Sequence, residues 1–190
     1  MRLPLVSLTN ELDQWIVSEL HQMMKELNES LSLYELEPAT KILLSFVEKL
    51  TNWYVRRSRR RFWASGMEDD KVAAYTTLWE VLETFLKCAA PFAPFITEKI
   101  WLEMSELCSQ NLELRARKAE AAQSFELLAL SSNHSIHLEH RPLQSDLYIN
   151  TQLIEEVETV RKIIKGALYL RAKKQVKVKQ PLQKLEFRIL

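Results

Sequence analysis

The segment from residue 50 to residue 63 reads LTNWYVRRSRRRFW, which places five arginines within six positions between aromatic-rich flanks. Guanidinium groups at this density repel one another, so a folded domain keeps them where anions or acids neutralise them. Phosphates beside an exposed base use both the cations and the aromatic rings. Because the formal net charge of the whole chain is only +1, this basic character is local. The segment therefore predicts a docking site on an otherwise near-neutral protein.

Composition excludes several classes of protein. The chain has 190 residues, 47% of them hydrophobic, which suffices for one domain with a core and a small appendage. Only two glycines occur, Gly66 and Gly166, which excludes glycine-rich phosphate loops and dinucleotide-binding fingerprints. Charges interrupt every apolar run before it reaches membrane-spanning length, and the N-terminus lacks the apolar stretch of a signal peptide.

Cysteine and histidine usage points to a reduced protein without a metal centre. The two cysteines, Cys88 and Cys108, form no Cys-x-x-Cys pair, which is typical of a cytoplasmic protein. His134, His137 and His140 lie in a polar stretch without a neighbouring cysteine, so we interpret them as solvated or hydrogen-bonded side chains. We expect no membrane partner and a cytoplasmic location.

Hydrophobic spacing predicts an all-α fold, a helical bundle of about five helices. We expect helices at residues 10–30, 38–63, 69–90, from 94 onward, and 151–174. Helix-start residues, early acids, Pro91 and Ser65-Gly66 set these boundaries. The expected core stripe of the third helix is Tyr75, Leu78, Leu82, Phe85, Leu86 and Ala89. That of the last helix is Ile154, Val157, Val160, Ile164 and Leu168.

Three stretches fall outside the regular bundle. Residues 105–131 are helical in composition but weakly patterned, and we interpret them as a variable insertion. Residues 131–150 are expected to form a loop with a short extended piece at residues 136–138. After residue 175 apolar residues alternate with lysines, and Gln180-Pro181 suggests a turn, which together predict a short β-like C-terminal tail.

The tail also determines the predicted domain division. Its alternating pattern continues to the last residue, and its apolar side chains have no later segment to pack against. We therefore assign residues 1–174 to a helical domain and residues 175–190 to the start of a truncated C-terminal α/β appendage.

Projected on an α-helix at about 100° per residue, the arginine segment separates into two faces. The core side is expected to hold Phe46, Leu50, Trp53, Arg57 and Arg61. A second face is expected to hold Asn52, Arg56, Arg59 and Trp63, with Arg60 beside them.

These two faces leave different alternatives open. We expect the outward arginines Arg56, Arg59 and Arg60 to contact RNA, since arginine forks onto phosphates and base edges. Arg57 and Arg61, which continue the core stripe, are expected to pair with structural acids. Trp63 either closes the bundle or offers a stacking platform to a base.

A second basic run lies near the C-terminus. It lacks interleaved aromatic residues, so it either attracts a nucleic-acid backbone without specificity or is a solvated face. Its members are Arg171, Lys173, Lys174, Lys177 and Lys179.

The arginine-rich segment resembles the signature of the anticodon-binding domain of isoleucyl-tRNA synthetases. Five further motifs resemble that family in the same order: ELDQW at 11–15, AYTTL at 74–78, APFAPFITE at 90–98, SIHL at 135–138 and VKVKQPL at 176–182. The resemblance covers most of the chain and leaves residues 105–131 unmatched. Valyl and leucyl relatives share the bundle but lack the arginine-rich run, so the isoleucine family is favoured. One departure is Lys179, where the family often has arginine, which puts a forked contact there in doubt.

The resemblance implies that the domain binds the anticodon stem and loop of the isoleucine tRNA. It implies that Trp63 stacks on an anticodon base, with Asn52 and Arg56 as neighbouring contacts. Arg59, Arg60, Lys177 and Lys179 complete the candidate set. The implied parent is an ATP-dependent ligase whose catalytic domain is the second partner. We expect no catalytic residue and no cofactor in these residues, because the ATP site and the zinc of the parent lie elsewhere.

Three other functions remain as alternatives. The chain could be a helical interaction module that docks on the synthetase body through salt bridges from Arg57 and Arg61. It could also be the tRNA-binding domain of a valyl or leucyl relative. A helical DNA-binding domain is disfavoured, because no short turn joins two helices at recognition spacing, and we expect no DNA partner.

Overall fold

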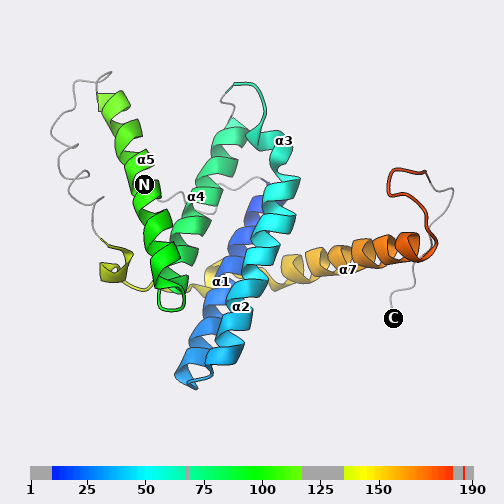
Figure 1. The fold of residues 1–190 in the computed structure, drawn as a ribbon, viewed down its shortest axis with the longest axis horizontal. Helices are drawn as coiled ribbons and strands as arrows, with labels where there is room; N and C mark the ends of the chain where they lie inside the picture. Colours follow the sequence, from blue (N-terminus) through cyan, green and yellow to red (C-terminus); the bar gives the residue numbers. More distant parts are fainter. Residues whose placement is uncertain (1–9, 67–68, 117–134, 182–185, 187–190) are drawn as a thin grey trace. The chain divides into compact units, whose positions relative to one another are not determined.

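The computed structural model describes residues 10–66, 69–116, 135–181 and 186. The chain divides into two compact units, residues 1–149 and residues 150–190. All regular structure in the described residues is helical, which confirms the all-α class (Figure 1). The predicted division into domains at residue 174 stays a prediction.

The observed helices end within two residues of most predicted boundaries. In the first unit they are α1 (Glu11–Ser32), α2 (Leu36–Glu48), the π-helix η2 (Lys49–Val55), α3 (Arg59–Phe62), α4 (Asp69–Ala89), α5 (Pro94–Ala116), and the 3-10 helices η3 (Ile136–Leu138) and η4 (Asp146–Tyr148). The second unit holds α7 (Thr151–Lys173). The predicted extended piece at residues 136–138 is wrong, because η3 occupies it. Of the predicted insertion, residues 105–116 continue α5, and residues 117–131 lie outside the described residues.

α1 is the centre of the first unit. Its Trp15, Ile16 and Leu27 side chains are fully buried, and α2 and α4 pack on it (Figure 1). A smaller cluster joins α4, α5 and η3 around Leu86 and Ile136. Glu98 on α5 fixes η3, because one of its carboxylate oxygens accepts hydrogen bonds from the Ile136 N–H and the Ser135 hydroxyl, both at 3.0 Å.

The predicted stripe of α4 is confirmed at Leu86 and Ala89, but in the first half of the helix the buried face lies one position away from it. Its buried residues include Ala74, Thr77 and Val81, whereas Tyr75 is 46% exposed and Leu78 and Leu82 are only half-buried. The side chains at these buried positions are small or of medium size. The hydrophobicity pattern passed over them in favour of the larger neighbours.

The segment from α2 to α3 is nearly continuous but is not one regular α-helix. Its buried residues after Phe46 recur every fourth position, at Leu50, Tyr54, Ser58 and Phe62. In a regular α-helix, steps of four drift around the axis, but the wider turn of a π-helix compensates for this drift. The predicted core positions Trp53 and Arg57 are therefore wrong: Trp53 is half-buried and Arg57 is exposed.

α7 and the tail differ from the predicted packing. None of the α7 residues is buried, and Val160 and Leu168 of the predicted stripe are 47% and 45% exposed. Residues 174–181 contain no strand, so the predicted β-like tail is wrong over this described part. Instead, the Arg171 guanidinium donates hydrogen bonds of 2.9 Å to the Lys177 and Gln180 carbonyls, which folds the tail into a turn.

The turn that follows helix α1 contains a residue with left-handed backbone conformation that is not glycine. Tyr34 has φ +59°, while the Glu35 N–H donates to the Ser30 carbonyl at 2.9 Å and the Tyr34 N–H donates to that of Leu31 at 3.1 Å. This is the helix-ending pattern in which glycine is favoured, because a Cβ strains the left-handed backbone. The chain has only two glycines, and at this position a tyrosine adopts the strained left-handed conformation instead.

Replacing Tyr34 with glycine is expected to stabilise the protein. The Tyr34 side chain is 90% exposed, so little contact is lost, and relief of the left-handed strain contributes about 1 kcal/mol. Urea denaturation of the variant measures the gain. Tyr34→Ala is the matched control, because it removes the ring but keeps the Cβ. If the alanine variant gains as much as the glycine variant, the strain is not the cause.

Candidate nucleic-acid interface

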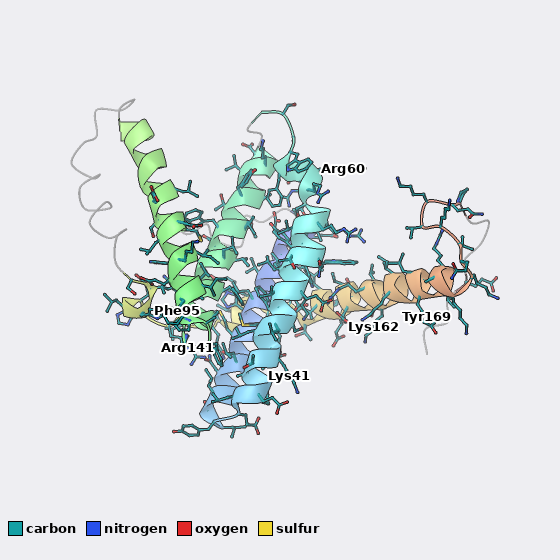
Figure 2. The ribbon with its side chains drawn as sticks, viewed as in Figure 1. Lys41, Arg60, Phe95, Arg141, Lys162 and Tyr169 are labelled. Atoms are coloured by element: carbon teal, nitrogen blue, oxygen red, sulfur yellow. The ribbon has the colours of Figure 1, made fainter. Side chains whose placement is uncertain are left out.

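Four of the five arginines in the basic segment are solvent-exposed. Arg56 and Arg57 follow η2, while Arg59 and Arg60 lie in α3, and Figure 2 labels Arg60. Within the described part of the chain, none of these four forms an ion pair with an acid. Among the described residues, these four guanidinium charges therefore have no acidic partner.

The fifth arginine, Arg61, is an internal clamp. Its guanidinium donates two parallel hydrogen bonds to the Asp13 carboxylate, at 2.8 and 2.7 Å, and its Nε donates to Asp70 at 2.9 Å. The Asp13 side chain is 1% exposed and that of Arg61 is 12% exposed. The expected pairing of Arg61 with structural acids is confirmed. Arg61 ties the start of α1 to α3 and to the start of α4.

Tyr54 completes this buried group. Its hydroxyl donates a 2.7 Å hydrogen bond to the same Asp13 carboxylate. Burial, followed by the negative charge of Asp13, raises the pKa of Tyr54 far above its usual value. The hydrogen bonds that Arg61 donates to the Asp13 carboxylate likewise raise the pKa of Arg61 above its usual value. Both donors therefore keep their protons at neutral pH, and the clamp does not change there.

The exposed tryptophan of the segment lies beside an arginine. The Trp63 side chain is 77% exposed, so the alternative that it closes the bundle is wrong. The guanidinium carbon of Arg59 lies 5.3 Å from the centre of the Trp63 ring system, within cation–π range. An exposed indole with an adjacent cation is a surface that stacks a base and attracts its phosphate.

The candidate residues fall into two groups in the structure. The predicted outward residues of the segment are all exposed: Asn52, Arg56, Arg59, Arg60 and Trp63. Lys177 and Lys179 are also exposed but belong to the second unit. The structure therefore supports one exposed basic and aromatic surface in the first unit, named here the arginine surface (Asn52, Arg56, Arg59, Arg60 and Trp63). The two lysines are described with the second unit, to which they belong.

Sequence reasoning assigned Arg57 to the core and so missed it as a surface residue. Its guanidinium carbon lies 4.3 Å from the centre of the Trp53 ring system. The signal that reveals it is the four-residue recurrence of buried positions, which sequence alone does not distinguish from ordinary helical spacing.

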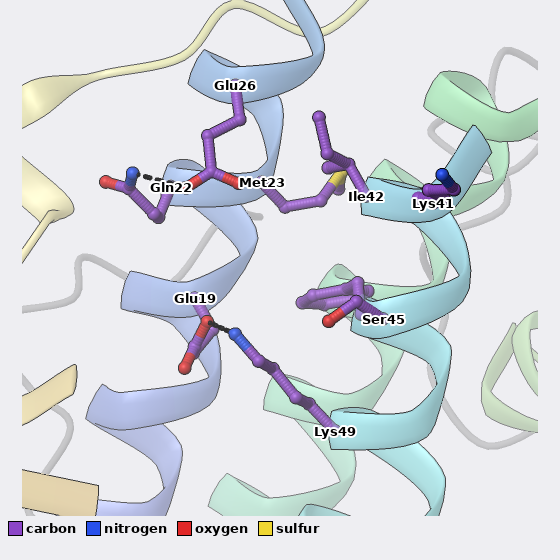
Figure 3. A pocket seen from close by; sticks show the side chains of 9 residues that line it. Glu19, Gln22, Met23, Glu26, Lys41, Ile42, Ser45 and Lys49 are labelled. Carbon is purple, nitrogen blue, oxygen red and sulfur yellow. Dashed lines mark hydrogen bonds and ion pairs between the residues drawn. The ribbon is translucent and has the colours of Figure 1, made fainter. Parts of the chain in front are cut away.

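The groove between α1 and α2 carries no catalytic arrangement among the residues that the structure describes. This groove has a volume of about 240 Å³, and Figure 3 shows the side chains that line it. Inside it the Lys49 ammonium lies 2.6 Å from a Glu19 carboxylate oxygen, and the Gln22 amide donates to Glu26 at 2.7 Å. These polar groups pair with one another, so we interpret the groove as part of the packing between the two helices.

Other chemistry-bearing residues also have structural explanations. Cys88 is buried and free, and burial raises the pKa of its thiol to about 11, which disfavours the reactive thiolate. In the part of the chain with described coordinates, no group of three or more potential metal ligands comes together. No helix in that part is both long and apolar enough to cross a membrane.

Comparisons with known proteins agree with this geometry. Residues 13–186 match the family model described as the anticodon-binding domain of tRNA ligase. The chain is similar to an isoleucine–tRNA ligase of Treponema denticola, with 36% identity over 96% of this chain and 14% of that protein. It is also similar to the isoleucine–tRNA ligase of Dehalococcoides mccartyi, with 38% identity over 90% of this chain and 15% of that protein. The isoleucine–tRNA ligase of Bacillus thuringiensis is 34% identical over 92% of this chain and 14% of that protein.

The described residues form a helical bundle that presents exposed arginines beside an exposed tryptophan. The family match covers most of the chain, and the chain belongs to the family of anticodon-binding domains of tRNA ligases. It spans about 14–15% of the length of the isoleucine–tRNA ligases to which it is similar.

Proposed function

We propose that this chain binds the anticodon stem and loop of the isoleucine tRNA, as part of an isoleucine–tRNA ligase. The observation that carries the proposal is the arginine surface. Its three arginines lack ion-pair partners among the described residues, and Trp63 lies beside one of them. Phosphate oxygens neutralise the guanidinium groups, and an unpaired anticodon base stacks on the indole.

The similarity to whole isoleucine–tRNA ligases supports the rest of the proposal. The remainder of such a ligase attaches isoleucine to the tRNA with ATP, and its catalytic domain is the second partner of this chain. The proposed ATP and zinc sites lie in that remainder, and the proposed location is the cytoplasm. In this proposal Lys177 and Lys179, which belong to the second unit, contact the phosphate backbone of the tRNA.

The structure weakens the main alternative, a module that docks through salt bridges from Arg57 and Arg61. Arg61 is already occupied by Asp13 and Asp70 inside the first unit. Arg57 lies over Trp53 and is exposed. Only one of the two invoked residues therefore remains open to a partner.

Arg56→Ala and Arg60→Ala are each expected to weaken RNA binding and to flatten its salt dependence. Loss of one phosphate contact lowers the slope of log affinity against log salt by about 1. The measurement is filter binding of the isoleucine tRNA, and of an unrelated tRNA, from low to high salt. Weaker binding of the unrelated tRNA supports specificity within this chain.

Lys41→Ala is the matched control. Lys41 is an exposed cation on α2 and is paired with Glu37 at 2.7 Å. Its loss is expected to leave both affinity and slope unchanged. Wild-type slopes in both arginine variants would refute the assignment of RNA to this surface.

A further inference from the structure

Arg57 and Trp53 form a second arginine–tryptophan pair on the same helical segment. The guanidinium carbon of Arg57 lies 4.3 Å from the Trp53 ring centre, closer than the 5.3 Å between Arg59 and Trp63. Trp53 is half-buried, whereas Trp63 is 77% exposed. The two pairs therefore present different groups to solvent. The Arg59–Trp63 pair exposes its indole, whereas the Arg57–Trp53 pair exposes a guanidinium that lies over a half-buried indole.

The π-helix explains why Arg57 is at the surface. In an uninterrupted α-helix, Arg57 follows Leu50 and Trp53 on the core side. The wide turns of η2 (Lys49–Val55) keep Tyr54 and Ser58 in line with the core instead. Both are fully buried, so the core position next to Arg57 is already filled by Ser58. π-helical segments are rare and occur often at functional sites.

The Arg57 guanidinium lies over the Trp53 ring and forms no hydrogen bond to another described residue. A guanidinium that lies over an indole keeps its in-plane N–H donors for a planar or tetrahedral anion. Arg57 forms no ion pair with an acid among the residues whose structure is described. The indole also restricts the motion of the side chain, which lowers the entropy lost when the guanidinium binds.

We propose that Arg57, held on Trp53, is a further RNA contact that binds a backbone phosphate, while Trp63 receives a base. This inference rests on the proposed function and extends its contact surface beyond Asn52, Arg56, Arg59, Arg60 and Trp63. Trp53 acts as a positioning residue, because its ring orients the Arg57 fork without needing to touch the RNA.

The test compares Arg57→Gln and Arg57→Lys with the wild-type chain, using an RNA hairpin with the anticodon stem and loop of the isoleucine tRNA. Arg57→Gln is expected to weaken binding about tenfold at low salt and to lower the salt slope by about 1. Arg57→Lys keeps the charge but loses the fork, so it is expected to retain the slope and part of the affinity. Because Arg57 is exposed, the urea unfolding midpoint is expected to stay at the wild-type value in both variants.

Two parallel measurements separate the possible failures. If the wild-type chain does not bind the hairpin, the proposed function fails and this inference fails with it. If the wild-type chain binds and Arg60→Ala weakens binding, but Arg57→Gln has wild-type affinity and slope, only the Arg57 contact is refuted. A lowered unfolding midpoint with unchanged RNA affinity in Arg57→Gln would show that the pair with Trp53 serves packing alone.

Discussion

Replacing Arg61 with alanine is expected to lower the free energy of unfolding by about 3–5 kcal/mol. The reason is the state of Asp13 after the change. Its side chain is 1% exposed, and it loses both parallel hydrogen bonds from Arg61, so among the described residues the Tyr54 hydroxyl remains as its side-chain donor. A carboxylate left buried without its cation carries the full cost of desolvation. Urea denaturation followed by circular dichroism measures the loss.

The neighbouring arginine supplies the matched control. Arg60→Ala removes the same charge from an exposed position in the same short helix, and it is expected to change stability by less than about 0.5 kcal/mol. Asp70→Asn tests the outer arm of the clamp. Since the Asp70 side chain is 54% exposed, its loss is expected to cost less than about 1 kcal/mol.

A double variant separates the pair from the rest of the core. Asp13→Asn with Arg61→Met removes both charges at once, so it is expected to recover part of the stability lost in Arg61→Ala. If Arg61→Ala costs no more than Arg60→Ala, the clamp does not hold the first unit together, and the buried geometry around Asp13 carries no net energy.

The helix boundaries were predictable because their causes are local. Asn10 accepts a hydrogen bond from the Leu12 N–H at 3.0 Å, Asn150 accepts one from the Leu153 N–H at 3.1 Å, and α5 begins at Pro94. Each signal lies within a few residues of the boundary that it sets. The faces of the helices were less predictable, because burial depends on partners elsewhere in the chain. In α4 the buried positions carry small residues such as Ala74, which hydrophobicity does not mark.

The candidate site shows the same limit. Exposure of Arg56 and Trp63 followed from helical projection. The partner of Arg61 did not, because Asp13 lies 48 residues earlier and no local pattern connects the two. Arg57 was assigned to the core side of the helix, because a projection at a constant angle per residue does not account for a π-helix. The widened turn rotates the residues around it about the helix axis, and here it moved Trp53 and Arg57 away from the core side while Arg56 and Trp63 stayed exposed.

Replacing Trp63 with alanine is expected to weaken binding of the anticodon stem and loop by about 1–3 kcal/mol, the range for loss of one stacked base. The exposed indole is the one large aromatic side chain of the arginine surface, and Arg59 lies at its side. Because the ring is 77% exposed, its removal is expected to leave the free energy of unfolding nearly unchanged. Fluorescence anisotropy with a labelled hairpin measures affinity, and urea denaturation measures stability.

Trp63→Phe and Tyr34→Ala distinguish stacking from a general effect of removing an aromatic ring. Phenylalanine keeps a flat apolar face, so Trp63→Phe is expected to recover part of the affinity. Tyr34 is a 90% exposed aromatic residue just after the C-terminal end of α1 and outside the arginine surface. Its change to alanine is therefore expected to leave RNA binding at the wild-type level. Equal losses in Trp63→Ala and Tyr34→Ala would contradict stacking at Trp63. A salt slope that is unchanged in Trp63→Ala while the affinity falls is the result that ties the loss to the ring, because the indole carries no charge and releases no counterion.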